Sequence, residues 1–230
     1  CVSIFFFIGC YGSYMSYAVK EFDIVGKLKK LYISYWKVFV VFIPLAFLLC
    51  SNQPAYCADS EIWSRYSSFS WQECLANFCG VNISYNREWW FLPSYVVALG
   101  SFPIIRAVIE KQALRSNLFI IVIASILVTD FFPSVGKLEV IGSLNSNLLY
   151  SRFICQAAPF VSSFWMGMVS AKDRVLERLF RSFQDNHLLG LGSIIAILCG
   201  VVIIRQSVIG ESADFIYIPI LIVVCKMLLE

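Results

Sequence analysis

The residues of this chain best suited to chemistry are three lysines that lie close together, Lys27, Lys29 and Lys30. Clustered ammonium groups bind phosphate oxygens through charge-assisted hydrogen bonds. Lysines also flank membrane helices on the cytoplasmic side, whatever the protein does. The cluster therefore has two interpretations, a phosphate site and a membrane flank. Lys27 and Lys30 are our candidates for binding the phosphates of a donor substrate.

A second candidate region combines polar and aromatic side chains where an apolar run begins, at Asn86, Glu88, Trp90 and Phe91. Asparagine is a favoured N-cap, and an acidic residue complements the positive end of a helix. Aromatic residues at this place are typical of the belt at a membrane surface, but they can equally line a substrate cavity. Arg152 lies a few residues inside another apolar run, where a charge is either functional or extends to the membrane interface.

Other catalytic signatures are absent from the sequence. It contains no serine hydrolase elbow, phosphate-binding loop, dinucleotide fingerprint or paired metal motif, and its single histidine, His187, borders a basic connection. Cys57, Cys74 and Cys79 share the segment 51–88, and two of them can form a disulfide in an oxidising compartment. The sequence does not give the pairing. Without a histidine beside them, a zinc site is not expected.

The composition indicates what kind of structure must position these residues. Hydrophobic residues make up 59% of the 230 residues, and charged residues make up 14%. A soluble domain has about a quarter of its residues charged, so lipid rather than water must cover much of this surface. The formal net charge of +3 is too small to indicate a nucleic-acid partner.

Seven apolar stretches have the length of a membrane helix or nearly so, since the bilayer core takes about 20 residues per helix. Backbone groups in lipid must bond within their own segment, so helices are expected. We therefore predict an all-α fold, a polytopic transmembrane bundle in a single domain over 1–230. The predicted spans are 1–18, 31–50, 89–105, 117–133, 148–171, 188–205 and 213–229.

The distribution of lysine and arginine orients the predicted bundle, because cytoplasmic connections are enriched in these residues. The connections 19–30, 106–116 and 172–187 carry 11 of the 18, whereas the alternate connections carry 4. The first three are therefore predicted to be cytoplasmic, and 51–88 is predicted to be a long external loop. The segment 172–183 has an arginine face and a leucine–phenylalanine face, which predicts an amphipathic helix on the inner leaflet.

Four segments of the sequence can be compared with a known family. They are SIFFFIGCYG at 3–12, KLKKLYISYW at 27–36, NREWWFL at 86–92 and FWMGMVSA at 164–171. Taken together, they resemble the acyltransferase type 3 family, which includes membrane O-acetyltransferases of O-antigen and other surface polysaccharides. The first segment resembles the second helix of the family, and the second resembles its basic motif, with Lys27 and Lys30 where the family has two arginines. The third segment resembles its Asn-Gly-x-x-Trp-Phe-Leu helix entrance, with Arg87 in place of Gly, and the fourth resembles its Phe-x-x-Gly-Met helix end.

The resemblance implies an enzyme of the bacterial inner membrane with no bound cofactor. Such enzymes take an acyl group, commonly acetyl from acetyl-CoA, and deliver it to a hydroxyl of a cell-surface or lipid-linked carbohydrate. The resemblance places the donor phosphates at Lys27 and Lys30. The residues that it implies for the acyl and acceptor cavity are Asn86, Glu88, Trp90 and Phe91. Arg152 is our further candidate for this cavity, because it is a charge inside an apolar run.

The catalytic residue of the family is a histidine in its first helix, the proposed base or acyl carrier. The chain opens with Cys1 inside an apolar run, and its first segment resembles the second helix of the family. We therefore expect the histidine to precede this sequence, and 1–230 alone to be inactive.

Two alternatives come from other classes. The first is a non-enzymatic transporter or flippase of lipid-linked oligosaccharide, a class that often shows internal repeats and several intramembrane charges. The sequence shows no such repeat. The second is a polysaccharide polymerase, whose key residues are expected in large external loops. The preceding sequence would discriminate them, since an Arg or Lys followed about three helical turns later by a His indicates the acyltransferase.

Overall fold

The fold is almost entirely helical in a computed structural model of the chain. Among the residues that it describes there is no strand, so the all-α prediction is confirmed. Three predicted residues, Arg152, His187 and Cys57, lie outside the described part. The described residues are 2–17, 23–50, 65–128, 158–185, 196, 198–203 and 214–229.

The helices follow the predicted apolar stretches, with differences at their ends. The second helix begins at Ile24, before the apolar run, because the Asp23 carboxylate accepts a hydrogen bond from the Gly26 backbone N–H at 2.7 Å. An aspartate at this position stabilises a helix start. The elements are α1 (Val2–Tyr17), α2 (Ile24–Cys50), α4 (Trp71–Phe78), the 3₁₀ helix η2 (Arg87–Trp90), α5 (Phe91–Ile109), α6 (Leu114–Ile126), α9 (Ala158–Lys172), α10 (Val175–Asp185) and α12 (Asp214–Leu229).

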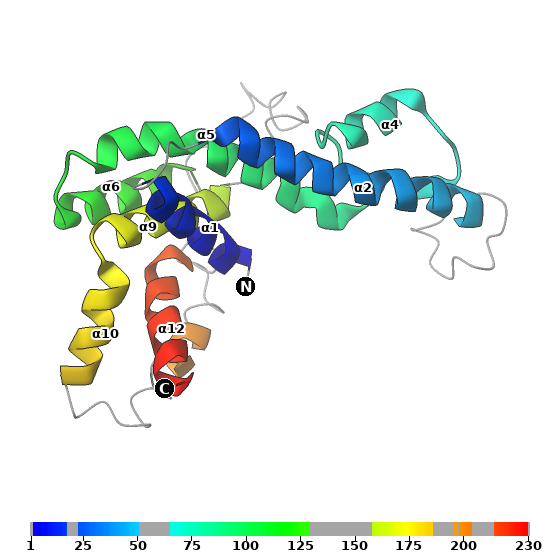
Figure 1. Cartoon of the computed structure of the whole chain (residues 1–230). Coiled ribbons are helices and arrows are strands. Elements are labelled where there is room, and N and C mark those ends of the chain that lie inside the picture. The colour runs from blue at the N-terminus through cyan, green and yellow to red at the C-terminus, as the bar shows by residue number, and fades with distance from the viewer. Residues whose placement is uncertain are drawn as a thin grey trace, which may run out of the picture.

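Helix α9 lies at the centre of the fold. Its sequence is apolar or small on every side, a pattern typical of a helix that is covered all round, and residues 160–171 are all buried. Helix α1 packs along it, and α5, α6 and α12 contact it as well (Figure 1). Three of the four family-like segments therefore lie close together. The segment 3–12 is in α1, and the segment 86–92 continues into α5, and both helices pack on α9, which contains the segment 164–171.

The contact between α1 and α9 depends on a glycine. A Cβ atom placed on Gly167 would lie 3.0 Å from the carbonyl carbon of Phe7 and 3.2 Å from its Cα, and closer still to its carbonyl oxygen. Small residues at helix crossings let two backbones approach closely in this way. The neighbouring Phe6 is fully buried, and its ring stacks on Phe160 with centroids 5.4 Å apart. Gly167 thus has a packing role.

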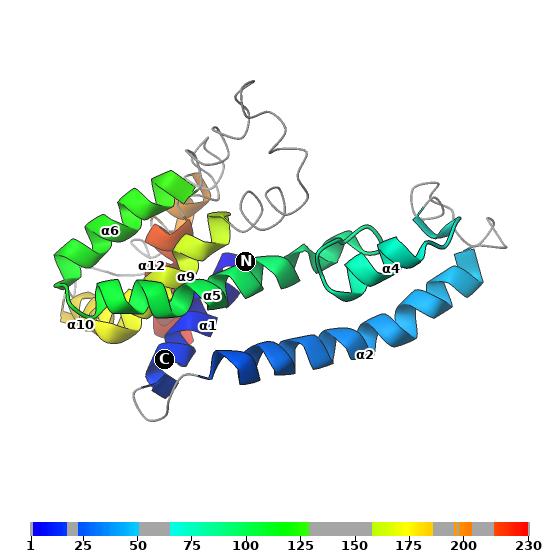
Figure 2. The same cartoon turned by 90° about the horizontal axis from the view of Figure 1, so that it is seen from above.

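Helix α2 is the longest described helix and leaves most of its surface uncovered. It runs beside part of α5 and then extends beyond it (Figure 2). Its exposed side chains are apolar, and four of them are between 57% and 73% exposed. They are Val40, Val41, Phe42 and Leu48. A contiguous apolar surface of this kind suits lipid or another protein better than water.

Part of the segment 51–88, predicted as an external loop, is helical, and its external location stays a prediction. Residues 71–78 form α4, and the chain around α4 folds back along α2 instead of extending away from it. The Tyr35 hydroxyl donates to the Asn77 carbonyl at 2.5 Å, and the Trp36 indole N–H donates to the Phe78 carbonyl at 3.0 Å. Aromatic donors on α2 therefore satisfy carbonyls at the end of α4, which hydropathy alone does not reveal.

Two helices in the described part are long and apolar enough to cross a membrane, namely α2 and the continuous segment Arg87–Ile109 formed by η2 and α5. Helices α1, α6, α9 and α12 have 13 to 16 residues, fewer than the roughly 20 that a bilayer core requires. The predicted spans 148–171 and 188–205 lie partly outside the described residues. The structure does not show a seven-span bundle, which stays a prediction.

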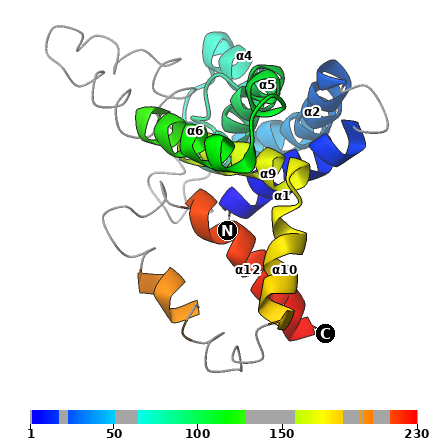
Figure 3. The same cartoon turned by 90° about the vertical axis from the view of Figure 1, so that its left-hand side faces the viewer.

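Helices α10 and α12 lie side by side and leave the layer of α1, α5 and α9 together (Figures 1 and 3). The predicted amphipathic segment 172–183 is largely α10, which is strongly amphipathic. Arg178 and Arg181 are exposed, whereas Leu176 and Phe180 are half-buried. The amphipathic helix is confirmed, and its place on the inner leaflet stays a prediction.

Candidate functional site

Lys27 and Lys30, the predicted donor-binding residues, differ in their surroundings. Lys27 is half-buried beside α1, and its ammonium group donates to the Ser13 hydroxyl at 2.6 Å. Ser13 in turn donates to the Gly9 carbonyl at 2.5 Å. Lys30 lies one turn further along α2 and is exposed. The structure therefore gives Lys27 a packing role on α1 and leaves Lys30 accessible.

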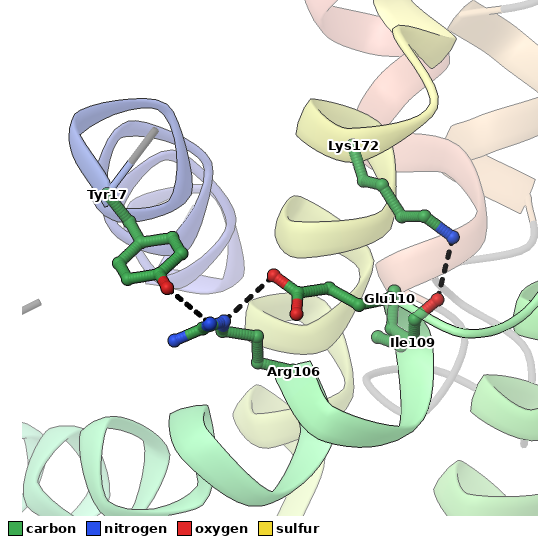
Figure 4. A network of polar contacts seen from close by, with 5 residues as sticks. All are labelled: Tyr17, Arg106, Ile109, Glu110 and Lys172. Carbon is green, nitrogen blue, oxygen red and sulfur yellow. Dashed lines mark hydrogen bonds and ion pairs between the residues drawn. The ribbon is translucent and has the colours of Figure 1, made fainter. Parts of the chain in front are cut away.

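A polar network joins the ends of α1 and α5 (Figure 4). The Arg106 guanidinium donates to the Tyr17 hydroxyl, lies 3.6 Å from the centroid of the Tyr17 ring, and pairs with Glu110 at 2.8 Å. Cations at the end of a helix are favoured because the last carbonyls carry partial negative charge. Arg106 thus ties the last turn of α5 to the last residue of α1.

Helix α9 joins the same end of the fold through Lys172. Its ammonium group donates to the Ile109 carbonyl at 2.7 Å (Figure 4) and to the Gln112 carbonyl at 2.5 Å. These carbonyls close or follow α5, where the last carbonyls of a helix are left without i+4 partners, and the Asn117 side-chain amide donates to both of them as well, at 3.3 and 3.4 Å. The basic connections 106–116 and 172–187 therefore meet at one end of the fold, in agreement with the charge count.

From the sequence, the cations of this end were expected only to mark the orientation of the helices. The structure instead assigns Lys172 and Arg106 to specific bonds between helices. The signal in the sequence is their place in the last turn of an apolar helix, where a side-chain donor can reach unpaired carbonyls.

Asn86 and Glu88, predicted for the acyl and acceptor cavity, form a helix start. The Asn86 side-chain oxygen accepts from the Glu88 backbone N–H at 3.0 Å, so the N-cap interpretation is confirmed. Glu88 is exposed. Whether either side chain also contacts a substrate stays a prediction.

Trp90 and Phe91 lie among aromatic rings of three helices. The Trp90 ring is 5.0 Å from Phe160, and Phe91 is 5.2 Å from Phe6 and stacks on Tyr95 at 5.5 Å. Aromatic pairs at these separations stabilise packing beyond their buried area. Arg152, predicted for the same cavity, lies outside the described residues. The structure thus brings Trp90 and Phe91 together with α1 and α9.

The aromatic residues at the start of α5 are well separated from the basic residues at its end. Arg106 is 16 positions after Trp90, and a helix rises 1.5 Å per residue, so the separation along the helix axis is about 24 Å. The hydrocarbon core of a bilayer is about 30 Å thick. The aromatic entrance and the basic end therefore lie at opposite ends of this helix.

A buried carboxylate at the start of α12 was not predicted. Asp214 is 3% exposed, and its two oxygens accept hydrogen bonds from the Ser3 and Tyr217 hydroxyls. A carboxylate removed from water needs such donors. The bonds fix the start of α12 to the start of α1. The available signal was an acid directly before a run that has no other charge until Lys226.

No family model, curated protein or solved structure matches the chain. The four family-like segments and the two separated ends of α5 are the features on which a functional proposal can rest.

Metal and thiol chemistry find little support in the described part. No group of three His, Cys, Asp or Glu side chains there is close enough to hold a metal ion. Cys74 and Cys79 are both free thiols, so they do not form the predicted disulfide with each other. Pairing with Cys57 lies outside the described residues.

Proposed function

We propose that this chain is part of a multi-pass O-acyltransferase of the bacterial inner membrane. In this proposal it transfers an acyl group, acetyl in the simplest case, from acyl-CoA to a hydroxyl of a cell-surface or lipid-linked carbohydrate. The partners are acyl-CoA, the carbohydrate acceptor and the lipid bilayer.

The observation that carries the proposal is the packing of the four family-like segments into one unit. Gly167 of the fourth segment lies against Phe7 of the first. Phe91 of the third lies 5.2 Å from Phe6 of the first, measured between ring centroids. The second segment joins through Lys27, which bonds to Ser13 just beyond the first. Segments separated by up to about 160 residues in the sequence thus share one region, as the parts of a single site must.

The second segment contacts the third as well. The Tyr35 ring of α2 lies edge-on to Trp89 with centroids 5.0 Å apart, and Phe39 lies 5.7 Å from the same indole. The helix that carries the lysines is therefore coupled mechanically to the aromatic entrance. This packing supports a single site in which the donor-binding helix and the acceptor region contact each other.

The exterior of the described helices supports a membrane environment. Two helices have spanning length and composition, and α6 adds exposed apolar residues such as Phe119 at 67%. A soluble protein rarely leaves so many large apolar side chains in water. Lipid contact accounts for them on both helices.

The donor role of the lysines is tested by substituting Lys27 and Lys30 with alanine in the full-length protein. After reconstitution in liposomes with radiolabelled acetyl-CoA and the carbohydrate acceptor, we measure base-labile label on the carbohydrate. Each partly exposed ammonium–phosphate bond contributes about 1 kcal/mol, so the double variant should raise KM for acetyl-CoA roughly 30-fold. The value of kcat should change by less than about twofold, because the lysines act in binding.

The matched control is Lys111→Ala, an exposed lysine of another predicted cytoplasmic connection. It should leave KM unchanged. Lys30→Ala alone removes an exposed side chain and separates donor binding from any loss of the Lys27–Ser13 bond. Equal KM values for wild type and both lysine variants would refute the donor site. Absence of ester label, together with movement of lipid-linked oligosaccharide across the bilayer, would replace the acyltransferase with the transporter.

A further inference from the structure

A pocket between α10, α12 and α1 is lined by none of the residues proposed for acyl transfer. Its volume is about 350 Å³, and its walls are partly polar and partly apolar. Pockets of a few hundred Å³ hold a small ligand or the head of a larger one. The apolar part is lined by Leu176, Phe180, Ile222 and Val223, and the polar part by Tyr11, Glu177, Arg181 and Lys226.

The charges of the pocket favour an anion. Arg181 and Lys226 both line it, and Arg181 makes no hydrogen bond or ion pair with the described residues. The Lys226 ammonium lies 3.9 Å from the centroid of the Phe180 ring, which holds it at the pocket wall. Glu177 is the single carboxylate among the described lining residues, and it lies within 4.0 Å of Arg174 outside the pocket. The described lining therefore carries two cationic side chains and one acidic side chain.

The combination of cations and apolar walls identifies the class of ligand. An anion without a tail would leave Leu176, Ile222 and the face of Phe180 in contact with water. An apolar molecule without a charge would leave Arg181 unpaired. A phosphate attached to a hydrocarbon tail matches both parts, because guanidinium and ammonium groups bind phosphate oxygens and methylenes cover the apolar wall.

The position on α10 favours a membrane lipid over a soluble phosphate ester. Helix α10 exposes Arg178 away from the pocket and lines the pocket beside α12 with Leu176, Phe180 and Arg181. Helices of this type lie in the headgroup region of anionic membranes. We propose that the pocket binds the phosphate and first methylenes of an acidic phospholipid. Arg181 and Lys226 hold the phosphate, and Ile222 and Phe180 contact the tail. This inference stands independently of acyl transfer.

The test measures lipid retention by native mass spectrometry of the full-length protein in detergent. The probes are phosphatidylglycerol and phosphatidylcholine of equal chain length, supplied at equal concentration. Both lipids carry a phosphate, but Arg181 and Lys226 repel the choline cation of phosphatidylcholine. Wild type should therefore retain phosphatidylglycerol in preference by about tenfold. The variant R181Q/K226Q should lose the preference.

Two further variants separate the pocket from general charge. R178Q removes an exposed arginine of the same helix that does not line the pocket, and it should keep the preference within about twofold of wild type. Ile222→Trp fills the apolar wall without changing charge and should weaken retention of both lipids. Circular dichroism checks that helical content is equal in all variants.

Three outcomes would overturn the proposal. Equal loss in R178Q and R181Q/K226Q would show a diffuse charge effect. Equal retention of the two lipids by wild type would remove the acidic phospholipid as ligand. Binding of palmitoyl-CoA that depends on Arg181 and Lys226, without retention of phosphatidylglycerol, would assign the same phosphate chemistry to an acyl-CoA instead.

Discussion

Replacing Gly167 by alanine should destabilise the protein through a single contact. The added Cβ would meet the backbone of Phe7, with 3.0 Å to its carbonyl carbon. Backbone atoms of a packed helix cannot rotate aside as the tip of a side chain can. Helix α1 would therefore have to shift away from α9, and the packing of Phe6 on Phe160 would loosen with it.

The magnitude follows from a comparison with a second glycine. Gly100 of α5 has no atom within 4 Å of an added Cβ, so Gly100→Ala gains helix propensity, about 1 kcal/mol, at no steric cost. Gly167→Ala has the same gain in propensity. Overpacking of a buried site costs about 1–3 kcal/mol, and contact with backbone places Gly167 at the upper end. The two variants should thus differ by about 3 kcal/mol.

Thermal unfolding followed by circular dichroism in mild detergent measures this difference. For a chain of this length each kcal/mol corresponds to about 2–4 °C in Tm, so Gly167→Ala should melt about 6–12 °C below Gly100→Ala. Gly12→Ala, on α1 itself, has equally open space and should behave like Gly100→Ala. If all three variants melted within a degree or so of one another, the close approach of α1 and α9 would be wrong.

Two further predictions concern hydrogen bonding. Burial raises the pKa of Tyr85 to about 12, and its hydroxyl has no partner among the described residues. Because the folded-state pKa lies above the usual 10, stability attributable to Tyr85 is complete below pH 10 and is lost as pH rises toward 12. The free energy of unfolding, measured with urea, should therefore fall less steeply with pH over that range for Tyr85→Phe than for wild type. Equal slopes for the two proteins would contradict the raised pKa of Tyr85. Lys172→Met should lower the free energy of unfolding by about 1–3 kcal/mol, because it removes the charged donor to the Ile109 and Gln112 carbonyls. The exposed Lys111→Met should change it by less than about 0.5 kcal/mol. A similar loss of unfolding free energy in Lys172→Met and Lys111→Met would contradict the stabilising role of the bonds from Lys172.

Local patterns in the sequence predicted those parts of the structure that depend on local physics. Uninterrupted apolar stretches predicted helices, and Asn86 was interpreted correctly as an N-cap, because a capping bond spans only two residues. The amphipathic helix α10 followed from the spacing of its arginines. The grouping of basic connections at one end was also predictable, since charge and helix direction alternate together.

Contacts between distant residues were not predictable from these patterns. Ser3 and Asp214 are 211 residues apart, and nothing near either residue specifies the other. The fold-back of α4 onto α2 depends on Tyr35 and Trp36, which hydropathy records only as aromatic membrane residues. Their role as donors to carbonyls 42 residues away in the sequence is visible only in the three-dimensional structure. The same limit explains why Lys27 was predicted as a binding residue and not as a partner of Ser13.

The central place of α9 has a consequence for how the protein is made. Helix α1 is complete at Tyr17, but α9 ends at Lys172, about 155 residues later. At about 5–20 residues per second on the ribosome, that interval lasts roughly 8–30 s. During this interval, Phe6 and Phe7 lack the surface of α9, which later helps to bury them. The early helices can therefore complete their packing only after α9 has been synthesised. An insertion factor that covers their apolar surfaces must stay bound for that interval.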